Sequence, residues 1–125
     1  MNRREFFALP LFLLPVLGRA EETGLTLVMF DQPGCVYCRR WTAEVGDAYD
    51  VTAEGAAAPL RRIDISEAAE SGLDLAAPVV FTPTFVLVRD GVEISRLEGY
   101  AGEDFFWGLL GRMIEEAGVP LANAG

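Results

Sequence analysis

The sequence predicts a single small α/β domain, and three observations support that class. The run at 25–30, Leu-Thr-Leu-Val-Met-Phe, is almost continuously apolar, as in a strand buried on both faces of a sheet. A helical pattern follows it directly. Further along, an Asp-Gly pair separates two strand-like runs, which is a strong signal for a β-hairpin. With 125 residues and no internal repeat or composition break, one domain accounts for the chain.

The N-terminal half has the pattern of a βαβ unit. The residues Asp-Gln-Pro-Gly at 31–34 end the first strand, and a helix is expected from 35 to about 49. Residues 55–59 are expected to form a loop, and 60–65 a second strand. The helix is expected because apolar and small residues recur on one of its faces: Cys38, Trp41, Thr42, Val45 and Tyr49.

The C-terminal half has the pattern α-ββα. A short helix is expected at 67–77, interrupted by Gly72 and ending before Pro78. Strands are expected at 85–88 and 92–97, on either side of the Asp-Gly turn at 90–91. The chain closes with a helix at 103–117, which carries acidic residues in its first turn.

The apolar side chains of the last helix cover an arc of about 200° at 100° per residue. They are Phe105, Phe106, Trp107, Leu109, Leu110, Met113 and Ile114. One interpretation is that Phe105 and Trp107 cover the edges of the core. The other is that they form a patch on which a partner protein docks.

The composition excludes several classes of function. The chain has no histidine, so hydrolases with a Ser-His-Asp or Cys-His site and most zinc or haem sites are excluded. It has no lysine, which excludes Schiff-base chemistry and a phosphate-loop lysine. A net charge of −9 argues against binding to nucleic acid or to anionic membranes. The reactive groups that remain are two cysteines.

Residues 1–20 have the layout of an export signal. Arg3 and Arg4 precede an apolar run at 6–18, and Gly18 and Ala20 offer small residues for cleavage. The two arginines fit either an ordinary positive segment or a twin-arginine signal. A run of thirteen residues rises only about 20 Å, too little to span a bilayer. We therefore expect a signal at 1–20 and an exported domain at 21–125, with no membrane span in the mature chain.

The predicted chemistry lies in Cys35-Val36-Tyr37-Cys38. This spacing places the two sulfurs one turn apart at the start of a helix, and Cys35 lies where backbone N–H groups are unpaired. A thiolate there is stabilised, so we expect the Cys35 pKa to fall below the free value of about 8.5. Cys35 is then the nucleophile, and Cys38 resolves the mixed disulfide. Arg39 and Arg40 are candidates to favour the thiolate further, or else they are solvated helix cations.

The cysteine pair has two alternative uses, a stabilising disulfide and a metal site. A stabilising disulfide with so small a ring restricts the unfolded chain little, by roughly 2 kcal/mol. One Cys-x-x-Cys motif supplies half of a tetrahedral zinc site, and no histidine completes it. A metal site shared across a dimer or a two-coordinate copper(I) site remains open. We expect no cofactor and no metal.

A second motif is Phe-Thr-Pro-Thr-Phe at 81–85. A proline directly before a buried strand indicates a tight turn, which a cis peptide bond would suit.

Taken together, these residues resemble the thioredoxin superfamily. The strand at 25–30, the Cys-Val-Tyr-Cys motif, Thr82-Pro83 before a hairpin, and Gly99 before a last helix follow the order of that family. The resemblance covers residues 24–117 and implies a minimal fold, a four-stranded mixed sheet flanked by helices. It also implies that Pro83 is cis beside the cysteines and that Thr82 pairs with an extended substrate segment. By the same resemblance Gly34, Gly99 and Tyr100 belong to the substrate groove.

A narrower resemblance is to the periplasmic thioredoxins of bacterial sulfur-oxidation (Sox) systems. It rests on the export signal, Gln-Pro-Gly-Cys-Val-Tyr-Cys at 32–38, Ala-Pro-Leu-Arg-Arg at 58–62, and above all Leu-Glu-Gly-Tyr at 97–100 with the sequence at 103–110. It implies a monomer that reduces a disulfide-bearing periplasmic protein such as the Sox carrier protein, with electrons from a membrane thiol transporter. The alternatives are a disulfide oxidant or isomerase, and a non-catalytic module that binds copper(I) or a partner.

Two departures from the thioredoxin pattern stand out. The buried aspartate that thioredoxins hold six residues before the first cysteine is Met29 here, so Asp31 or a water would have to accept the proton of Cys38. The leading βα unit of full-length thioredoxins is also missing.

Overall fold

The computed structural model describes residues 19–121, and it confirms the predicted fold class. Its four strands form one mixed sheet in the order β2-β1-β3-β4, in which β1 pairs parallel with β2 and antiparallel with β3. The elements are helix α1 (Ala20–Thr23), strand β1 (Leu25–Asp31), helix α2 (Val36–Trp41), π-helical turn η3 (Thr42–Gly46), helix α3 (Asp47–Tyr49), helix α4 (Ala53–Ala57), strand β2 (Leu60–Asp64), 3-10 helix η4 (Ile65–Glu70), strand β3 (Thr84–Arg89), strand β4 (Val92–Glu98) and helix α5 (Glu103–Glu116).

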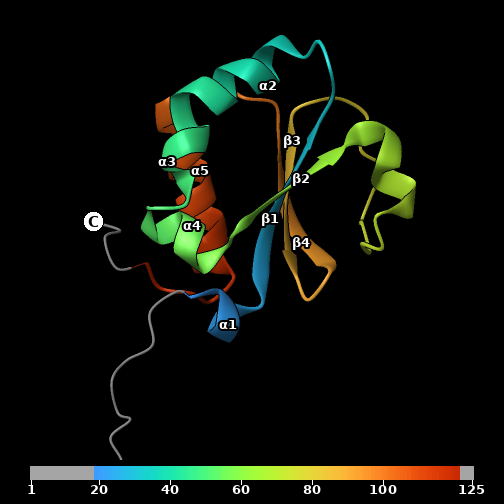
Figure 1. Ribbon diagram of the computed structural model, residues 1–125. Coiled ribbons are helices and arrows are strands. Elements are labelled where there is room, and N and C mark those ends of the chain that lie inside the picture. The colour runs from blue at the N-terminus through green and yellow to red at the C-terminus, as the bar shows by residue number, and fades with distance from the viewer. Residues whose placement is uncertain (1–18, 122–125) are drawn as a thin grey trace, which may run out of the picture.

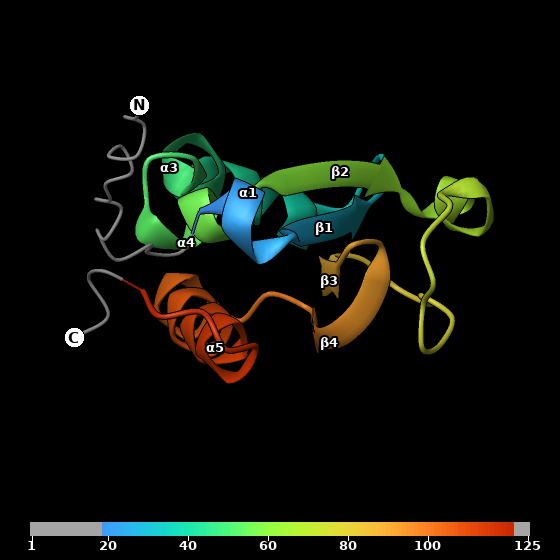
Figure 2. The same cartoon turned by 90° about the horizontal axis from the view of Figure 1, so that it is seen from below.

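The two faces of the sheet are covered differently. Helices α2, α3, α4 and α5 lie on one face, and η4 with the irregular segment after it lies on the other, as Figures 1 and 2 show from two directions. Strand β1 therefore has a buried side chain on each face along most of its length. Its alternate residues Leu25, Leu27 and Met29 join the core under the helices, whereas Val28 and Phe30 join the smaller core opposite. This explains why the strand is apolar without alternation.

The helix predicted from Cys35 begins one residue later and continues to Tyr49 as α2, η3 and α3. Its middle turn is π-helical, which widens the helix by one residue between Thr42 and Gly46. The predicted inner face is confirmed at Cys38, Trp41, Val45 and Tyr49, which are buried, whereas Thr42 is half-buried. Trp41 packs against Phe85 and Phe106 at ring-centroid distances of 5.4 and 5.6 Å.

Two local predictions were wrong. Part of the loop expected at 55–59 is helical, because α4 spans Ala53–Ala57 and Thr52 caps it by accepting a hydrogen bond from the Gly55 amide. The helix expected at 67–77 is instead η4, which ends at Glu70. Beyond it Gly72 has a positive φ of 81°, outside the range of a right-handed helix.

The hairpin and the last helix follow the prediction closely. Asp90 and Gly91 have φ values of 51° and 85°, the pair of positive angles that a tight two-residue hairpin needs. In α5, the Trp107 ring stacks on the Tyr49 ring with centroids 5.9 Å apart, so Trp107 covers the edge of the core, which is the first of the two interpretations. Phe105 does not, since 65% of it is exposed.

The predicted export signal falls outside the described residues, apart from Arg19 and Ala20. Within residues 19–121, no helix combines the length and the apolar character needed to cross a membrane.

Candidate active site

The two cysteines are joined as a disulfide at the start of α2. Their Cα atoms are 5.2 Å apart, and Cys35 is the residue that caps the helix. Its sulfur accepts a hydrogen bond from the Cys38 amide at 3.1 Å, so one of the N–H groups that the first helical turn leaves unpaired points at this sulfur. Cys38 is 4% exposed, whereas Cys35 is partly accessible. The outer sulfur is thus the one that a partner protein can reach.

An open groove of about 570 Å³ runs beside this disulfide. Gly34, Cys35, Cys38 and Arg39 all line it. Gly34 is exposed and has a φ of 82°, so the turn between β1 and α2 needs a residue without a side chain at this point. The structure therefore gathers Gly34, both cysteines and Arg39 in one place.

The second predicted motif is tied to the end of β4. The peptide bond between Thr82 and Pro83 is cis, and Pro83 is buried. The Pro83 carbonyl accepts a hydrogen bond of 2.8 Å from the Gly99 amide. Thr82-Pro83 and Gly99-Tyr100, the two segments predicted to form the substrate groove, are in this way bonded to each other, although neither lines the groove beside the disulfide.

Tyr100 and Arg40 join that loop to α2. The Tyr100 hydroxyl donates a hydrogen bond to the Glu44 carboxylate, and Arg40 lies 3.6 Å from the same carboxylate. The Arg40 guanidinium is also 5.8 Å from the centre of the Tyr100 ring and 6.0 Å from that of Tyr37. Burial, followed by the bond to Glu44, raises the pKa of Tyr100. Arg40 thus engages Glu44 and two tyrosine rings, while Arg39 faces the groove with the cysteines.

Asp31 lies at the far wall of the same groove. Its carboxylate forms an ion pair with Arg62 at 2.7 Å, and Arg62 also donates to the Thr42 hydroxyl at 3.0 Å. Thr42 in turn donates to the Cys38 carbonyl at 3.0 Å. The position held by an aspartate in thioredoxins is Met29, which is fully buried in the core.

Sequence reasoning missed Arg62, Thr42 and Glu44 as parts of this site. Glu44 could have been found, since it lies four residues after Arg40, a spacing that brings side chains together on a helix. Arg62 could not, because it reaches Asp31 across 31 residues of chain.

Exposed apolar side chains lie within or next to both predicted motifs. Val36 and Tyr37, between the cysteines, are 55% and 52% exposed. Val80 and Phe81, just before the cis peptide bond, are exposed as well.

Comparison with known proteins shows which family has this fold and this cysteine pair. The family model for a thioredoxin-like domain matches residues 17–114. This chain belongs to the thioredoxin-like family. It is 56% identical to the periplasmic thioredoxin SoxS from Paracoccus pantotrophus, solved in its reduced form, with a TM-score of 0.72 and coverage of 74% of this chain and 98% of that one.

More distant thioredoxins share the fold. The oxidised thioredoxin from Plasmodium falciparum is 20% identical with a TM-score of 0.57, covering 74% of this chain and 83% of its own. The thioredoxin from Fasciola hepatica is 25% identical with a TM-score of 0.52, covering 77% and 82%. A search among curated proteins gave no match.

A thioredoxin-like domain with a Cys35–Cys38 pair is a thiol-disulfide oxidoreductase. Thioredoxins act on disulfide-bearing protein substrates. In the part of the chain that the structure describes, no group of three or more cysteine or acidic side chains is arranged to hold a metal ion.

Proposed function

We propose that this thioredoxin-like protein reduces a disulfide on a periplasmic partner protein, with Cys35 as nucleophile and Cys38 as resolving thiol. The observation that carries the assignment of roles is the difference in exposure between the two sulfurs at the start of α2. The Cys35 sulfur is partly accessible and accepts a hydrogen bond from the Cys38 amide, whereas Cys38 is buried. This difference supports Cys35 as the sulfur that meets a protein disulfide first.

The reaction transfers two electrons in two exchanges. The Cys35 thiolate attacks one sulfur of the partner disulfide, which forms a mixed disulfide and releases the partner's other sulfur as a thiolate. Cys38 then gives its proton to a water or to Asp31 and attacks the Cys35 sulfur, which releases the second partner thiolate. The Cys35–Cys38 disulfide that results is the form seen in the structure. A dithiol donor must reduce it before the next cycle.

The substrate groove is proposed to consist of Gly34, Thr82, Pro83, Gly99 and Tyr100. The hydrogen bond between Gly99 and Pro83 supports this, because it holds the two loops side by side. The buried ring of Tyr100 would form a wall of the substrate groove. It would not hydrogen-bond to the substrate, because its hydroxyl already donates to Glu44.

Arg39 is proposed to favour the Cys35 thiolate, together with the amides of the first helical turn. Its place in the groove supports this, whereas Arg40 faces Glu44. Loss of Arg39 would then raise the pKa of reduced Cys35 more than loss of Arg40. A titration of thiolate absorbance in the two glutamine variants measures the difference, and equal effects would contradict the assignment.

The cellular context is also a proposal. The relative at 56% identity is a periplasmic thioredoxin, and residues 1–20 have the layout of an export signal, by the Sec or the twin-arginine route. On this basis the domain at 21–125 is exported, acts as a monomer in the periplasm, reduces the Sox carrier protein and receives electrons from a membrane thiol transporter. Neither a cofactor nor a metal takes part.

The decisive experiment traps the mixed disulfide. The Cys38→Ser variant keeps the nucleophile but cannot resolve the intermediate, so it should form a covalent complex with its partner in periplasmic extracts of the native host. The Cys35→Ser variant is the matched control and should form none. Mass spectrometry of the complex identifies the partner, and recovery of no complex with Cys38→Ser would contradict the proposed function.

The direction of the reaction is tested separately by the reduction potential of the cysteine pair. A reductase should have a value near that of thioredoxin, about −270 mV, and a strong oxidant one near −120 mV. A reduction potential near −120 mV would reverse the proposed direction and favour a disulfide oxidant.

A further inference from the structure

The segment between η4 and β3 has no regular secondary structure, yet it is fastened to β4 along its length. At its start, the Asp74 amide donates to the Gly91 carbonyl at 2.8 Å, and the Glu93 amide donates to the Asp74 carbonyl at 2.9 Å. Asp74 thus pairs with Val92 as a single parallel bridge on the outer edge of the sheet. The segment is held by these bonds to β4 and the turn before it, and by Leu73, Leu75 and Val79, which pack against the smaller core.

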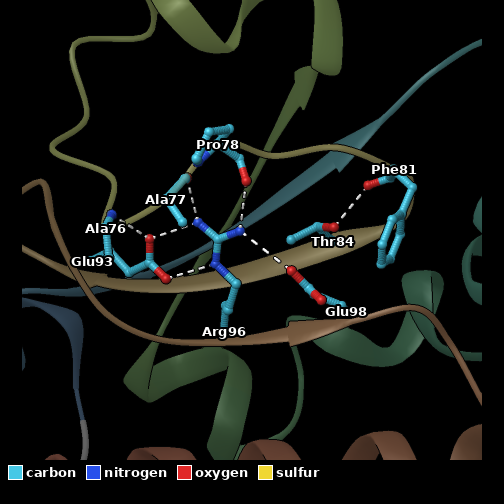
Figure 3. A network of polar contacts seen from close by, with 8 residues as sticks. All are labelled: Ala76, Ala77, Pro78, Phe81, Thr84, Glu93, Arg96 and Glu98. Carbon is cyan, nitrogen blue, oxygen red and sulfur yellow. Dashed lines mark hydrogen bonds and ion pairs between the residues drawn. The ribbon is translucent and has the colours of Figure 1, made fainter.

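Arg96 of β4 continues this attachment toward the active site. Its guanidinium donates to the Ala77 carbonyl at 2.8 Å and to the Pro78 carbonyl at 3.1 Å, as Figure 3 shows. It is also bound by both carboxylate oxygens of Glu93, at 2.7 and 2.8 Å. Glu98 adds a longer contact at 3.5 Å. One side chain therefore fixes two consecutive backbone carbonyls.

Glu93 completes the arrangement by accepting a hydrogen bond of 2.8 Å from the Ala76 amide. The side chains of Glu93 and Arg96 are only 6% and 14% exposed. The hydrogen bonds from Arg96, opposed in part by burial, hold the pKa of Glu93 below its usual range. An ion pair this sheltered keeps a fixed geometry, because every charged group has its partner.

The far end of the segment is fixed as well. The Thr84 hydroxyl donates to the Phe81 carbonyl at 2.7 Å, also drawn in Figure 3, and the Pro83 carbonyl accepts the Gly99 amide. Val80, Phe81 and Thr82 lie between the carbonyls that Arg96 holds and the Pro83 carbonyl that Gly99 holds, and Thr82 is the one of these three proposed to meet the substrate. Arg96 holds one end of that stretch and Gly99 the other, and both belong to β4 or to the turn that follows it.

We propose that Arg96, supported by Glu93, is a positioning residue for the substrate-binding loop that carries Thr82 and Pro83. This inference rests on the proposed function. Arg96 itself touches neither the substrate nor the cysteines. It fixes the backbone at Ala77 and Pro78, so that the Thr82 backbone is preformed for pairing with an extended protein segment. Preformed binding groups lower the ordering cost of association.

The test compares Arg96→Gln with the wild type on two substrates. The first is insulin, a protein disulfide whose backbone can pair with Thr82, with dithiothreitol as the electron source. The second is dithiobis(nitrobenzoate), a small disulfide without a peptide backbone. We expect KM for insulin to rise by on the order of tenfold, as for a binding group displaced by a fraction of an ångström. The rate with the small disulfide and the reduction potential should not change.

Three further variants control this experiment. Arg96→Lys should recover part of the KM, because one ammonium group cannot hold two carbonyls and a carboxylate together. Glu93→Gln keeps the hydrogen bonds from Arg96 to the Ala77 and Pro78 carbonyls, so it should raise KM for insulin less than Arg96→Gln does. It replaces Arg96→Gln in the comparison if that variant does not fold. Arg112→Gln removes an exposed arginine of α5 and should leave both reactions unchanged.

The possible outcomes are distinct. An unchanged KM for insulin, or an equal loss of activity with both disulfides, would overturn the role of Arg96. Failure of the wild-type protein to reduce insulin would instead contradict the proposed function.

Discussion

At the scale of single residues, several side chains hold the backbone of distant segments in place by hydrogen bonds. Arg96 does so at Ala77 and Pro78, and Glu93 does so at Ala76. Tyr49 does the same in the main core, where its buried hydroxyl donates to the Ala58 carbonyl at 2.6 Å. Burial, with nearby acidic groups, raises the pKa of Tyr49, so this donor keeps its proton. Such contacts fix backbone that lies outside the regular helices and strands.

The Glu93 carboxylate makes stability dependent on acid. Its pKa is lowered in the folded protein, so folding favours the ionised form, and this contribution is complete above the unfolded pKa of about 4.3. It is lost as the pH falls through the lower, folded value. Glu93→Gln should be less stable than wild type near neutral pH, by about 1–3 kcal/mol, and should lose less stability on acidification.

Urea unfolding at a series of pH values between about 7 and 3 measures the effect. The control is Glu115→Gln, which removes an exposed carboxylate of α5. If Glu93→Gln and wild type lose stability in parallel as the pH falls, the carboxylate is not the source of the dependence.

At the scale of elements, the sequence predicted those whose signal is local and strong. Strand β1, the Asp-Gly hairpin and α5 lie within two residues of their expected bounds. Helix α4 was missed because five residues are too few to show helical periodicity, and its start depends on the Thr52 side chain. The helix predicted at 67–77 ends at Glu70, because backbone groups of Asp74 and Ala76 are bonded to β4 and the turn before it.

Helix α4 depends on a glycine for its packing. A Cβ at Gly55 would overlap the Tyr49 carbonyl and touch the Asp50 backbone, neither of which can move freely. Gly55→Ala should therefore destabilise the protein by about 2–4 kcal/mol, as overpacking in a tight core does.

Gly108 in α5 is the matched control, since a Cβ there meets nothing within 4 Å. Gly108→Ala should stabilise by up to about 1 kcal/mol, because alanine favours the helix. Thermal or urea unfolding of both variants gives the comparison, and a neutral Gly55→Ala would show that the contact with Tyr49 relaxes.

At the scale of the whole molecule, the site is assembled by topology more than by sequence proximity. The cysteines and the Thr82-Pro83 pair were predictable because each is a short local motif. The contacts that arrange them were not, since Tyr100 reaches Glu44 across 56 residues and Arg96 reaches Ala77 across 19. Such pairs are set by strand order and register, which local patterns leave open.

The relative stability of the two redox forms tests the direction of the reaction on the whole domain. If the protein is a reductase, its oxidised form should unfold at a higher urea concentration than its reduced form. The small ring that the disulfide closes limits the difference to roughly 2 kcal/mol in the chain-entropy model. A reduced form that is the more stable one would indicate an oxidant, since stabilising the dithiol raises the reduction potential.

The arrangement of arginines on the sheet has a consequence for self-association. The outer strands of a sheet present unpaired backbone groups on which a second sheet can grow. Here β2 and β4 are the outer strands, and each carries arginine: exposed Arg61 and Arg62 on the first, and Arg96 on the second. Arg96 and the Asp74 bridge also fasten a length of chain along the outside of β4. A chain without lysine thus protects both edges with arginine, and this opposes edge-to-edge aggregation.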